Sequence, residues 1–316
     1  MNLSDIKSLY FKPLMAIIET AHSIHKTHFD TQKIQASRLL SIKTGACPED
    51  CCYCSQSARY KTEVKKETLL TLKTVLEKAK EAQKEGATRF CMGAAWREVK
   101  DGSSFDKVLE MVRAVNDLGL EVCCTLGMLT LKQAQKLKQA GLYAYNHNID
   151  TSPEFYSKII TTRKYEDRLQ TLKNVRQAGL TVCTGGILGL GESKEDRISF
   201  LNQLHLISPP PESITINLLV PMKGTPLENQ KPISTLEVVR VIAVARILMK
   251  KSMIRLSAGR ARMNETEQLL CFYSGANSIF LGDKLLTAEN PSLSSDEQLL
   301  NTIGLQLSKS SENLHV

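Results

Sequence analysis

The sequence lacks several features that would place the protein outside the soluble, globular class. No run of about eighteen apolar residues occurs, and the richest late stretch, Val238 to Met249, is interrupted by Arg240 and Arg246. The first residues lack the basic region and apolar core of a secretory signal. No linker-like or low-complexity segment occurs before about residue 288. We therefore expect a cytoplasmic protein without a membrane span.

The composition favours an ordinary globular surface. The apolar fraction is 42% and the charged fraction 23%, both typical of globular proteins, and the net charge is +8. Nucleic-acid binders usually gather such an excess on one face or tail. Here lysines are spread through predicted helices, for example at Lys73, Lys78 and Lys84. The charge therefore predicts a solvated surface and no nucleic-acid partner.

Strand-like and helix-like segments alternate along most of the chain. Strands are predicted at about 38–45, 88–94, 121–127, 143–150, 181–189, 214–220, 253–258 and 278–282. Helices are predicted at about 67–84, 104–118, 130–139, 164–178, 193–206, 234–250 and 263–274. Eight strands separated by helices imply parallel pairing with right-handed crossovers. The pattern predicts an α/β fold of one domain, a (β/α)8 TIM-type barrel.

The two ends of the chain differ from this repeat. Apolar residues from Leu14 to Phe29 follow a helical spacing, which predicts an N-terminal helical extension over residues 1–33. The barrel is then expected over 34–288. Residues 289–316 are rich in Ser, Asn and Gln, and we expect a flexible C-terminal tail there.

Four of the nine cysteines fall within the eight residues from Cys47 to Cys54. Clustered thiolates select zinc, copper(I) or iron–sulfur clusters. A zinc site usually takes four protein ligands, often from CxxC-type pairs. Cys47, Cys51 and Cys54 have three and then two residues between them, and no second such pair occurs. A 4Fe–4S cluster held by these three would keep one iron open, which indicates chemistry rather than electron transfer alone.

The fourth loop cysteine, Cys52, is ambiguous. Using it in place of Cys51 gives spacings of four and one, and the one-residue gap would crowd two thiolates. We therefore interpret Cys52 as a spectator. Free buried thiols or a zinc knuckle are the alternatives to a cluster. An odd cysteine count and a reducing compartment both argue against a disulfide framework.

Three polar residues share one face of the predicted fourth strand. Asn146, Asn148 and Asp150 alternate along it, and every second residue of a barrel strand points into the lumen. Against apolar helices these groups would be costly without partners. They are expected to line the lumen at the C-terminal end of the barrel, where barrel active sites lie. His147 has the opposite parity and is predicted to be a packed structural histidine.

Four other predicted strands each carry one unusual group, namely Cys91, Cys123, Cys183 and Arg255. A single cysteine in a strand is usually a small buried hydrophobe. Three of them on three strands of one barrel, with a basic residue on a fourth, favour a second metal site. Cys124 has the opposite parity and should face the helices. Cys271 lies in a helical pattern and is predicted to belong to the core.

The Cys47 loop resembles that of the radical S-adenosylmethionine superfamily, and the surrounding sequence is similar to that of the biotin synthases. The similarity runs from about residue 10 to about residue 288. It includes the segments Ser41–Ala46, Ser55–Tyr60, Phe90–Trp96, Tyr145–Asp150 and Arg255–Arg260. The loop alone is specific only to the superfamily, whereas the combination is specific to one enzyme family.

The resemblance implies two clusters. A 4Fe–4S cluster is expected on Cys47, Cys51 and Cys54. A 2Fe–2S cluster is expected on three cysteines and an arginine, at positions that match Cys91, Cys123, Cys183 and Arg255. Arginine is almost always protonated and is a poor metal ligand. A cluster with such a weak arginine ligand is implied to be consumed in the reaction.

The resemblance also implies contacts to small molecules. S-adenosylmethionine is expected to contact the backbone near Tyr53 and Ala94, the side chains of Asn148 and Asp150 through its ribose, and Arg168 through its carboxylate. Asn146 and Asn217 are expected to hydrogen-bond the ureido ring of dethiobiotin. Guanidinium groups match carboxylates, and carboxylate and amide oxygens accept from O–H and N–H groups. The glycine-rich segment 185–192 is expected to flank the adenine. The alternative is that its glycines serve only close backbone packing.

The implied reaction is insertion of sulfur into dethiobiotin to give biotin, the last step of biotin biosynthesis. A 5′-deoxyadenosyl radical, formed from S-adenosylmethionine, would abstract hydrogen from the substrate, and the smaller cluster would donate sulfide. The implied partners are a flavodoxin or ferredoxin, the iron–sulfur assembly machinery and a second copy in a homodimer. One alternative is a lipoyl synthase-like enzyme, which is disfavoured because residues 1–46 contain no cysteine. The other is a zinc-stabilised nucleic-acid-binding module.

Overall fold

The computed structural model describes residues 1–309, and its centre is a closed barrel of parallel strands. The strands pair in the order β2-β3-β4-β5-β6-β7-β8-β1, and pairing between β1 and β2 closes the ring. They are β1 Lys33–Lys43, β2 Arg89–Ala94, β3 Glu121–Thr125, β4 Ala144–Asn146, β5 Thr181–Leu188, β6 Ser213–Leu218, β7 Met253–Leu256 and β8 Ser278–Leu281. The predicted (β/α)8 barrel is confirmed.

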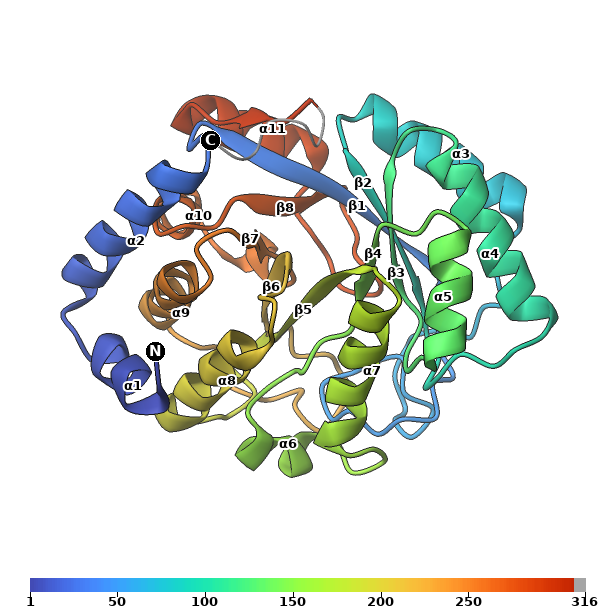
Figure 1. Ribbon diagram of the computed structural model, residues 1–316, viewed down its shortest axis with the longest axis horizontal. Coiled ribbons are helices and arrows are strands. Elements are labelled where there is room, and N and C mark those ends of the chain that lie inside the picture. Colours follow the sequence, from blue (N-terminus) through green and yellow to red (C-terminus); the bar gives the residue numbers. More distant parts are fainter. Residues whose placement is uncertain (310–316) are drawn as a thin grey trace.

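Helices surround the barrel on all sides (Figure 1). They are α3 Leu72–Lys84, α4 Ser103–Asn116, α5 Leu131–Gln139, α6 Pro153–Ile159, α7 Tyr165–Gln177, α8 Lys194–Leu206, α9 Thr235–Leu248 and α10 Glu265–Tyr273. Several begin with a side-chain cap, such as the capping box that joins Ser193 to Asp196. Helix α6 was not predicted, and its short length explains why its periodicity is weak.

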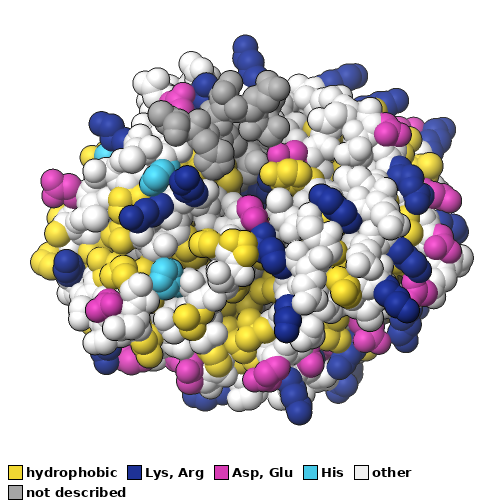
Figure 2. Space-filling view, viewed as in Figure 1, with side chains coloured by type: hydrophobic (Ala, Val, Ile, Leu, Met, Phe, Trp, Pro, Cys, Tyr) yellow, Lys and Arg dark blue, Asp and Glu magenta, His cyan; other side chains and the backbone are white. Residues whose placement is uncertain are grey.

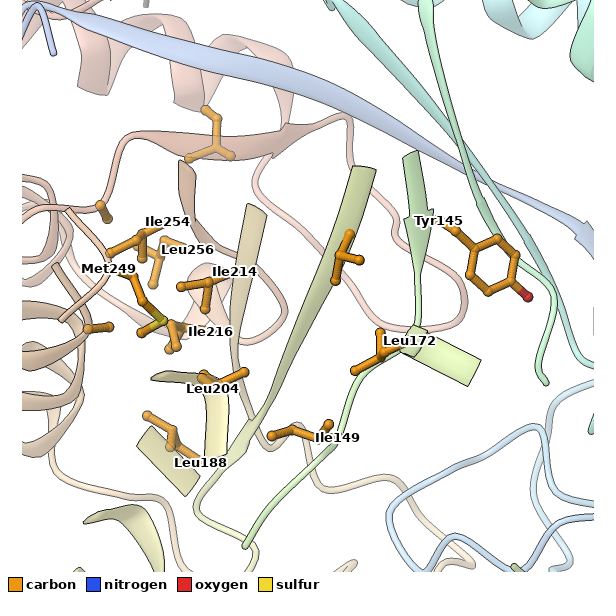
Figure 3. Close-up of a cluster of buried hydrophobic side chains, with 14 of the residues drawn as sticks. Tyr145, Ile149, Leu172, Leu188, Leu204, Ile214, Ile216, Met249, Ile254 and Leu256 are labelled. Carbon is orange, nitrogen blue, oxygen red and sulfur yellow. The ribbon is translucent and has the colours of Figure 1, made fainter. Parts of the chain in front are cut away.

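The main core lies between the outer face of the strands and the helices. Figure 3 shows Ile214 and Ile216 of β6 together with Ile254 and Leu256 of β7, on the side of Met249. All five side chains are buried. Alternate residues of these strands point to the helices, and the residues between them point into the lumen. This alternation separates an apolar shell from a lumen that can carry polar groups and thiols.

The N-terminal extension packs against the outside of the barrel. It contains α1 Leu3–Tyr10 and α2 Leu14–His28, which lie against α8 and α9 (Figure 1). The Tyr10 hydroxyl donates to Glu237 at 2.9 Å and accepts from Arg197 at 3.1 Å. The helix predicted from Leu14 to Phe29 is confirmed as α2. Helix α1 comes before it and begins with a capping box between Asn2 and Asp5.

The C-terminal segment is ordered where a flexible tail was expected. Residues Leu293–Ile303 form α11, and β9, Gln306–Leu307, pairs with the start of β1. Asp296 of α11 binds the buried guanidinium of Arg260, with an Oδ2–Nη2 distance of 2.8 Å. Buried guanidinium groups need such a counter-charge, so this helix neutralises a charge inside the barrel wall. The expectation of a flexible tail was wrong for residues 293–307, and residues 310–316 lie outside the described part. The division at residues 33 and 288 stays a prediction.

The surface shown in Figure 2 carries no single block of positive charge. Lysine and arginine side chains lie around its rim and alternate with acidic ones. Within residues 1–309, no helix has the length and apolar character that crossing a membrane requires.

Candidate active site

A cavity of about 320 Å³ opens at the C-terminal end of the barrel strands. The predicted site residues on its wall are Tyr53, Cys54, Cys91, Cys123, Asn146, Asn148, Asp150, Asn217 and Arg255. They come from five strands or strand ends and from the loop after β1, which the closed barrel brings together. The other predicted site residues, Cys47, Cys51, Ala94, Arg168 and Cys183, are not part of that wall. Arg168 and Cys183 lie directly behind it, as the contacts below show.

The cysteine loop after β1 folds back on itself. Gly45 and Ala46 both have left-handed backbone conformations, with φ of 71° and 54°, and turn the chain out of the strand. The Cys47 N–H then donates to the Gln56 carbonyl at 2.9 Å, and the Ala58 N–H donates to the Cys47 carbonyl at 2.7 Å. These bonds close the loop into a fixed ring around its three spaced thiols. Cys54 and its neighbour Tyr53 face the cavity.

Two acidic residues within the loop anchor it to the segment after α6. The Asp50 carboxylate accepts from the backbone N–H groups of Thr161 at 2.9 Å and Thr162 at 3.2 Å. Glu49 is buried beside Arg97 at 3.1 Å and Arg163 at 3.8 Å. Sequence reasoning missed this anchor. The adjacent acidic residues inside a cysteine motif were the available signal, but the partners Thr161, Thr162 and Arg163 lie more than a hundred residues away along the chain.

Burial keeps the loop thiols protonated in the free chain. It raises the pKa of Cys51 to about 12 and that of Cys54 to about 11, and it also raises the pKa of Cys47. The positive charge of Arg163 opposes this effect at Cys47 and Cys51. Metal binding must therefore displace protons from these thiols, as it does at other thiolate sites.

The three spaced thiols of the loop are free, and one of them, Cys54, opens onto the cavity. Soft thiolate donors of this kind suit an iron–sulfur cluster. Cys51 and Cys52 are both buried, and the Cys52 N–H donates to the Ile159 carbonyl at 3.0 Å. The interpretation of Cys52 as a spectator stays a prediction.

Asp150 sits at the centre of a buried polar group beside the loop. One carboxylate oxygen accepts from the Tyr53 hydroxyl at 2.9 Å and is paired with Arg168. Arg168 also donates to the Tyr156 hydroxyl at 2.8 Å and to the Asn148 carbonyl at 2.6 Å. In the free chain Arg168 is therefore engaged in orienting Asp150. The contact of Arg168 with the carboxylate of S-adenosylmethionine stays a prediction. It would require the pair of Arg168 and Asp150 to rearrange, or Arg168 to share its N–H groups between the two carboxylates.

The amide residues form a second network across the lumen. Asn146 donates to the Cys183 sulfur at 3.2 Å and to the Asn148 side-chain oxygen at 3.3 Å. Thr215 donates to that same oxygen at 2.9 Å. Asn217 donates to the Gly186 carbonyl at 3.0 Å and lies further out on the cavity wall. The prediction that Asn146, Asn148 and Asp150 share one face is therefore confirmed. The regular part of β4 is shorter than predicted: it ends at Asn146, and the chain turns at Asp150, with φ of 67°.

Three lumen cysteines lie together below this network. Cys91 and Cys123 are partners in the β2–β3 register, and the Cys123 side chain is within hydrogen-bond reach of both Cys91 and Cys183. Their contacts with Cys123, together with the nearby charge of Arg255, lower the pKa of Cys91 and Cys183. The same contacts raise the pKa of Cys123.

Arg255 is held rigidly at the edge of this group. It is 1% exposed, and it donates to the hydroxyls of Ser278 at 3.0 Å and Ser37 at 2.9 Å. Its guanidinium lies 4.5 Å from the Phe280 ring centroid. These contacts fix a side chain that faces both the cavity and the cysteines, as the sequence pattern predicted.

The remaining thiols and His147 behave as structural residues. Cys124 and Cys271 pack in the outer apolar core, apart from the lumen cluster that contains Cys91 and Cys123. His147 is 3% exposed, and burial lowers its pKa well below the usual value. Gly185 also has a structural role, because a side chain at this position would collide with Thr215 of the neighbouring strand β6.

Comparison with known proteins places this site in a family. The radical SAM superfamily matches residues 41–204, and the Biotin and Thiamin Synthesis associated domain matches residues 215–306. The biotin synthase of Cytophaga hutchinsonii is 56% identical over 309 residues, covering 98% of this chain and 92% of that protein. The biotin synthase of Legionella pneumophila (strain Corby) is 56% identical over 304 residues, covering 96% of both chains.

Solved structures agree on the fold. Methylornithine synthase (PylB) superposes with a TM-score of 0.80 at 19% identity, covering 97% of this chain and 94% of that one. The hydrogenase maturase HydG from Carboxydothermus hydrogenoformans has a TM-score of 0.82 at 17% identity, with coverage of 99% and 77%.

These matches define the class first: the chain is a radical S-adenosylmethionine enzyme built on a (β/α)8 barrel. Within that class, full-length similarity at 56% identity decides the family, and the chain belongs to the biotin synthases.

Replacing Asp150 with asparagine is expected to weaken S-adenosylmethionine binding about tenfold or more, since a charge-assisted hydrogen bond is worth roughly 1.5–3 kcal/mol. It should also destabilise the fold by about 3–5 kcal/mol, because Arg168 is left buried without its counter-charge. Equilibrium dialysis and urea unfolding measure the two effects. Tyr53→Phe removes only one hydrogen bond to the same carboxylate and is the matched, milder control. An unchanged dissociation constant in Asp150→Asn, with the cluster intact, would contradict the assignment.

The Asp50 anchor predicts a dependence of stability on pH. Partial burial favours the neutral acid, but hydrogen bonds from Thr161 and Thr162 outweigh it and lower the pKa of Asp50 from 3.8 to about 2. A depressed pKa stabilises the fold above the unfolded value, and this contribution disappears as pH falls from about 4 towards 2. Asp50→Asn should therefore be less stable than the parent at pH 6, with a difference that shrinks in acid. Urea unfolding of the cluster-free chain from pH 6 to pH 3 tests this, and a constant difference would show that charge is not involved.

Proposed function

We propose that this member of the biotin synthase family inserts sulfur into dethiobiotin to form biotin, with the Cys47 loop and the lumen cysteines as two separate cofactor sites of one cavity. When bound, a 4Fe–4S cluster at the loop would supply the electron that cleaves S-adenosylmethionine, and a 2Fe–2S cluster in the lumen would supply the sulfur. The single observation that carries the proposal is that two separate groups of thiols line one cavity. Cys54 reaches it from the loop after β1, and Cys91 and Cys123 reach it from strands β2 and β3.

The chain's own residues perform three tasks in this scheme. Cys47, Cys51 and Cys54 would hold the larger cluster, and Cys91, Cys123, Cys183 and Arg255 the smaller one. Asp150 and Asn148 present acceptor oxygens where ribose hydroxyls would bind, next to Tyr53. Asn146 lies between these acceptors and the Cys183 sulfur, so an amide ring held by Asn146 would rest directly above the lumen thiols.

The barrel itself excludes water from the reacting centre. Cys91, Cys123, Cys183 and Arg255 are each at most 3% exposed. A reactive radical survives in such a site because no solvent competes for it. The loop of Leu285 and Leu286 forms part of the cavity wall and adds apolar surface to it.

The test is a single-turnover assay on protein purified and reconstituted without oxygen. The expected result is about one biotin or less per chain when the sulfur comes from the protein, together with 5′-deoxyadenosine. Iron and sulfide analysis of the same sample should show two kinds of cluster by Mössbauer spectroscopy. Zinc in place of iron, or deoxyadenosine without biotin in the unaltered protein, would overturn the proposal.

Several properties of the working enzyme are included in the proposal on the basis of family resemblance. The reductant is a flavodoxin or ferredoxin, the clusters come from the iron–sulfur assembly machinery, and the enzyme is a cytoplasmic homodimer. The barrel proper is assigned to residues 34–288, with the helical extension before it. Size-exclusion chromatography with light scattering tests the dimer, and a monomer at micromolar concentration would contradict it.

A further inference from the structure

A second buried arginine lies beneath the lumen cysteines. Arg89 begins β2 two residues before Cys91, so both side chains belong to the same face of the strand. Register places Arg89 opposite Glu121 of β3, one layer below the Cys91–Cys123 pair. On the other side, the β1–β2 register places Arg89 opposite Ser37 of β1. The Ser37 hydroxyl accepts a hydrogen bond from Arg255 at 2.9 Å. The two arginines therefore flank the same part of the lumen floor.

The guanidinium of Arg89 is incompletely satisfied. The residue is 4% exposed; its Nε and Nη2 atoms both lie 2.8 Å from one oxygen of Glu121, and the group lies 5.2 Å from the Tyr143 ring centroid. Its Nη1 atom is buried and has no hydrogen-bond partner. A charged donor left unpaired inside a protein is costly, so a structure that retains one needs an explanation.

The charge of Arg89 is felt by all three lumen cysteines. Burial by itself would lower the pKa of Arg89, but Glu121 and then Cys123, Cys91 and Cys183 act in the opposite direction and raise it. The pKa of Cys91 and that of Cys183 are lowered mainly by contact with Cys123, and Arg255 and then Arg89 add smaller effects of the same sign. Arg89 is not among the residues expected to contact S-adenosylmethionine or dethiobiotin. Binding of these two molecules therefore does not explain why the buried arginine is there.

We propose that Arg89 is a positioning residue of the three-cysteine site, which supplies its second positive charge and a free N–H from the side opposite the cavity. This inference rests on the proposed function, because it concerns the cluster expected there. A 2Fe–2S centre brings negative charge in its thiolates and sulfides into a dry barrel. Arg255 is at the cavity wall, next to the reaction, whereas Arg89 lies below and acts only through the cysteines.

The test compares charge variants in protein reconstituted without oxygen. Arg89→Gln removes the charge, Arg89→Lys keeps it, and Glu121→Gln removes the counter-charge while leaving Arg89. Arg38→Gln is the matched control. Arg38 of β1 also forms an ion pair, with Glu85 at 2.9 Å, but its side chain lies on the outer face of the barrel. The readouts are the midpoint potential of the smaller cluster and its rate of loss to a chelator, followed by absorbance and Mössbauer spectroscopy.

The proposal predicts shifts of opposite sign. Arg89→Gln should lower the potential and speed cluster loss roughly tenfold, the usual scale for residues that support metal ligands from behind. Arg89→Lys should restore most of both values, and Glu121→Gln should raise the potential. A purely structural ion pair would instead make Arg89→Gln and Glu121→Gln behave alike, and that result overturns the inference.

The remaining outcomes are also decisive. If Arg89→Gln does not fold, Arg89→Lys is compared with Glu121→Gln. Only a charge effect raises the midpoint potential of the smaller cluster in Glu121→Gln while leaving it unchanged in Arg89→Lys. Values equal to those of Arg38→Gln in every variant would overturn the inference while leaving the proposed function intact. Absence of a smaller cluster from the unaltered protein would overturn the proposed function, and the inference with it.

Discussion

Cys47→Ala, Cys51→Ala and Cys54→Ala are each expected to abolish cleavage of S-adenosylmethionine, whereas Cys52→Ala should retain it. Each of the first three changes removes one thiolate from a cluster that has only three, so the cluster loses a corner it cannot replace. The spacing of the loop leaves Cys52 outside the expected ligand set, and its backbone N–H, which alanine keeps, holds the loop to Ile159. The measurement is 5′-deoxyadenosine formed per chain with dithionite as the reductant.

Cys52→Ala is also the control for this experiment, since it removes a thiol of the same loop. Its iron and sulfide content should equal that of the parent. Loss of the cluster in Cys52→Ala together with its retention in Cys51→Ala would show that the ligand assignment is wrong by one residue.

Cys183→Ala is expected to eliminate biotin formation while leaving the larger cluster in place. The three cysteines proposed to hold that cluster lie on the loop after β1 and are untouched, so some deoxyadenosine should still form. The lumen group loses one of three thiols, and Asn146 loses the sulfur to which it donates. Mössbauer spectroscopy and a single-turnover biotin assay on the same sample measure both effects. A normal biotin yield would refute the two-cluster arrangement, because a sulfur donor cannot be dispensable.

Arg255→Ala is the milder counterpart in the same barrel. A guanidinium holds iron less well than a thiolate, so the smaller cluster and part of the product should remain. The hydroxyls of Ser37 and Ser278 lose their donor, but Ser278 still donates to Gln35 at 3.1 Å, which limits the structural cost. Loss of both clusters in Arg255→Ala would instead assign Arg255 a structural role.

Strand periodicity was sufficient to predict which side chains share the lumen. Cys91 and Cys123 were placed together, and Cys124 apart from them, by parity alone, since the side-chain period of a strand is two and a barrel has only an inside and an outside. The same argument placed Asn146 and Asp150 on one cavity wall. The separation of Cys52 from the three other thiols of the loop rests on spacing alone and stays a prediction.

Long-range polar pairing could not be predicted in this way. The bond between Asp50 and Thr161, the pair formed by Asp150 and Arg168, and the pair between Arg260 and Asp296 each join groups whose sequence neighbours give no sign of the partner. The last of these also explains why residues 293–303 were mistaken for part of a tail. Their polar composition is that of a frayed end, but a buried guanidinium elsewhere in the chain requires the carboxylate that they carry.

The sequence by itself determined the barrel, its parity and the two sets of thiols, because these follow from local periodicity and from spacings within a single loop or strand. Only the tertiary structure decided how the charges inside are balanced. Arg89 could be seen in the sequence as a residue near Cys91, but its free Nη1 atom and its bond to Glu121 exist only when β1, β2 and β3 are in register. Charge balance in a dry interior depends on distances across strands, and those distances are set by the closure of the barrel.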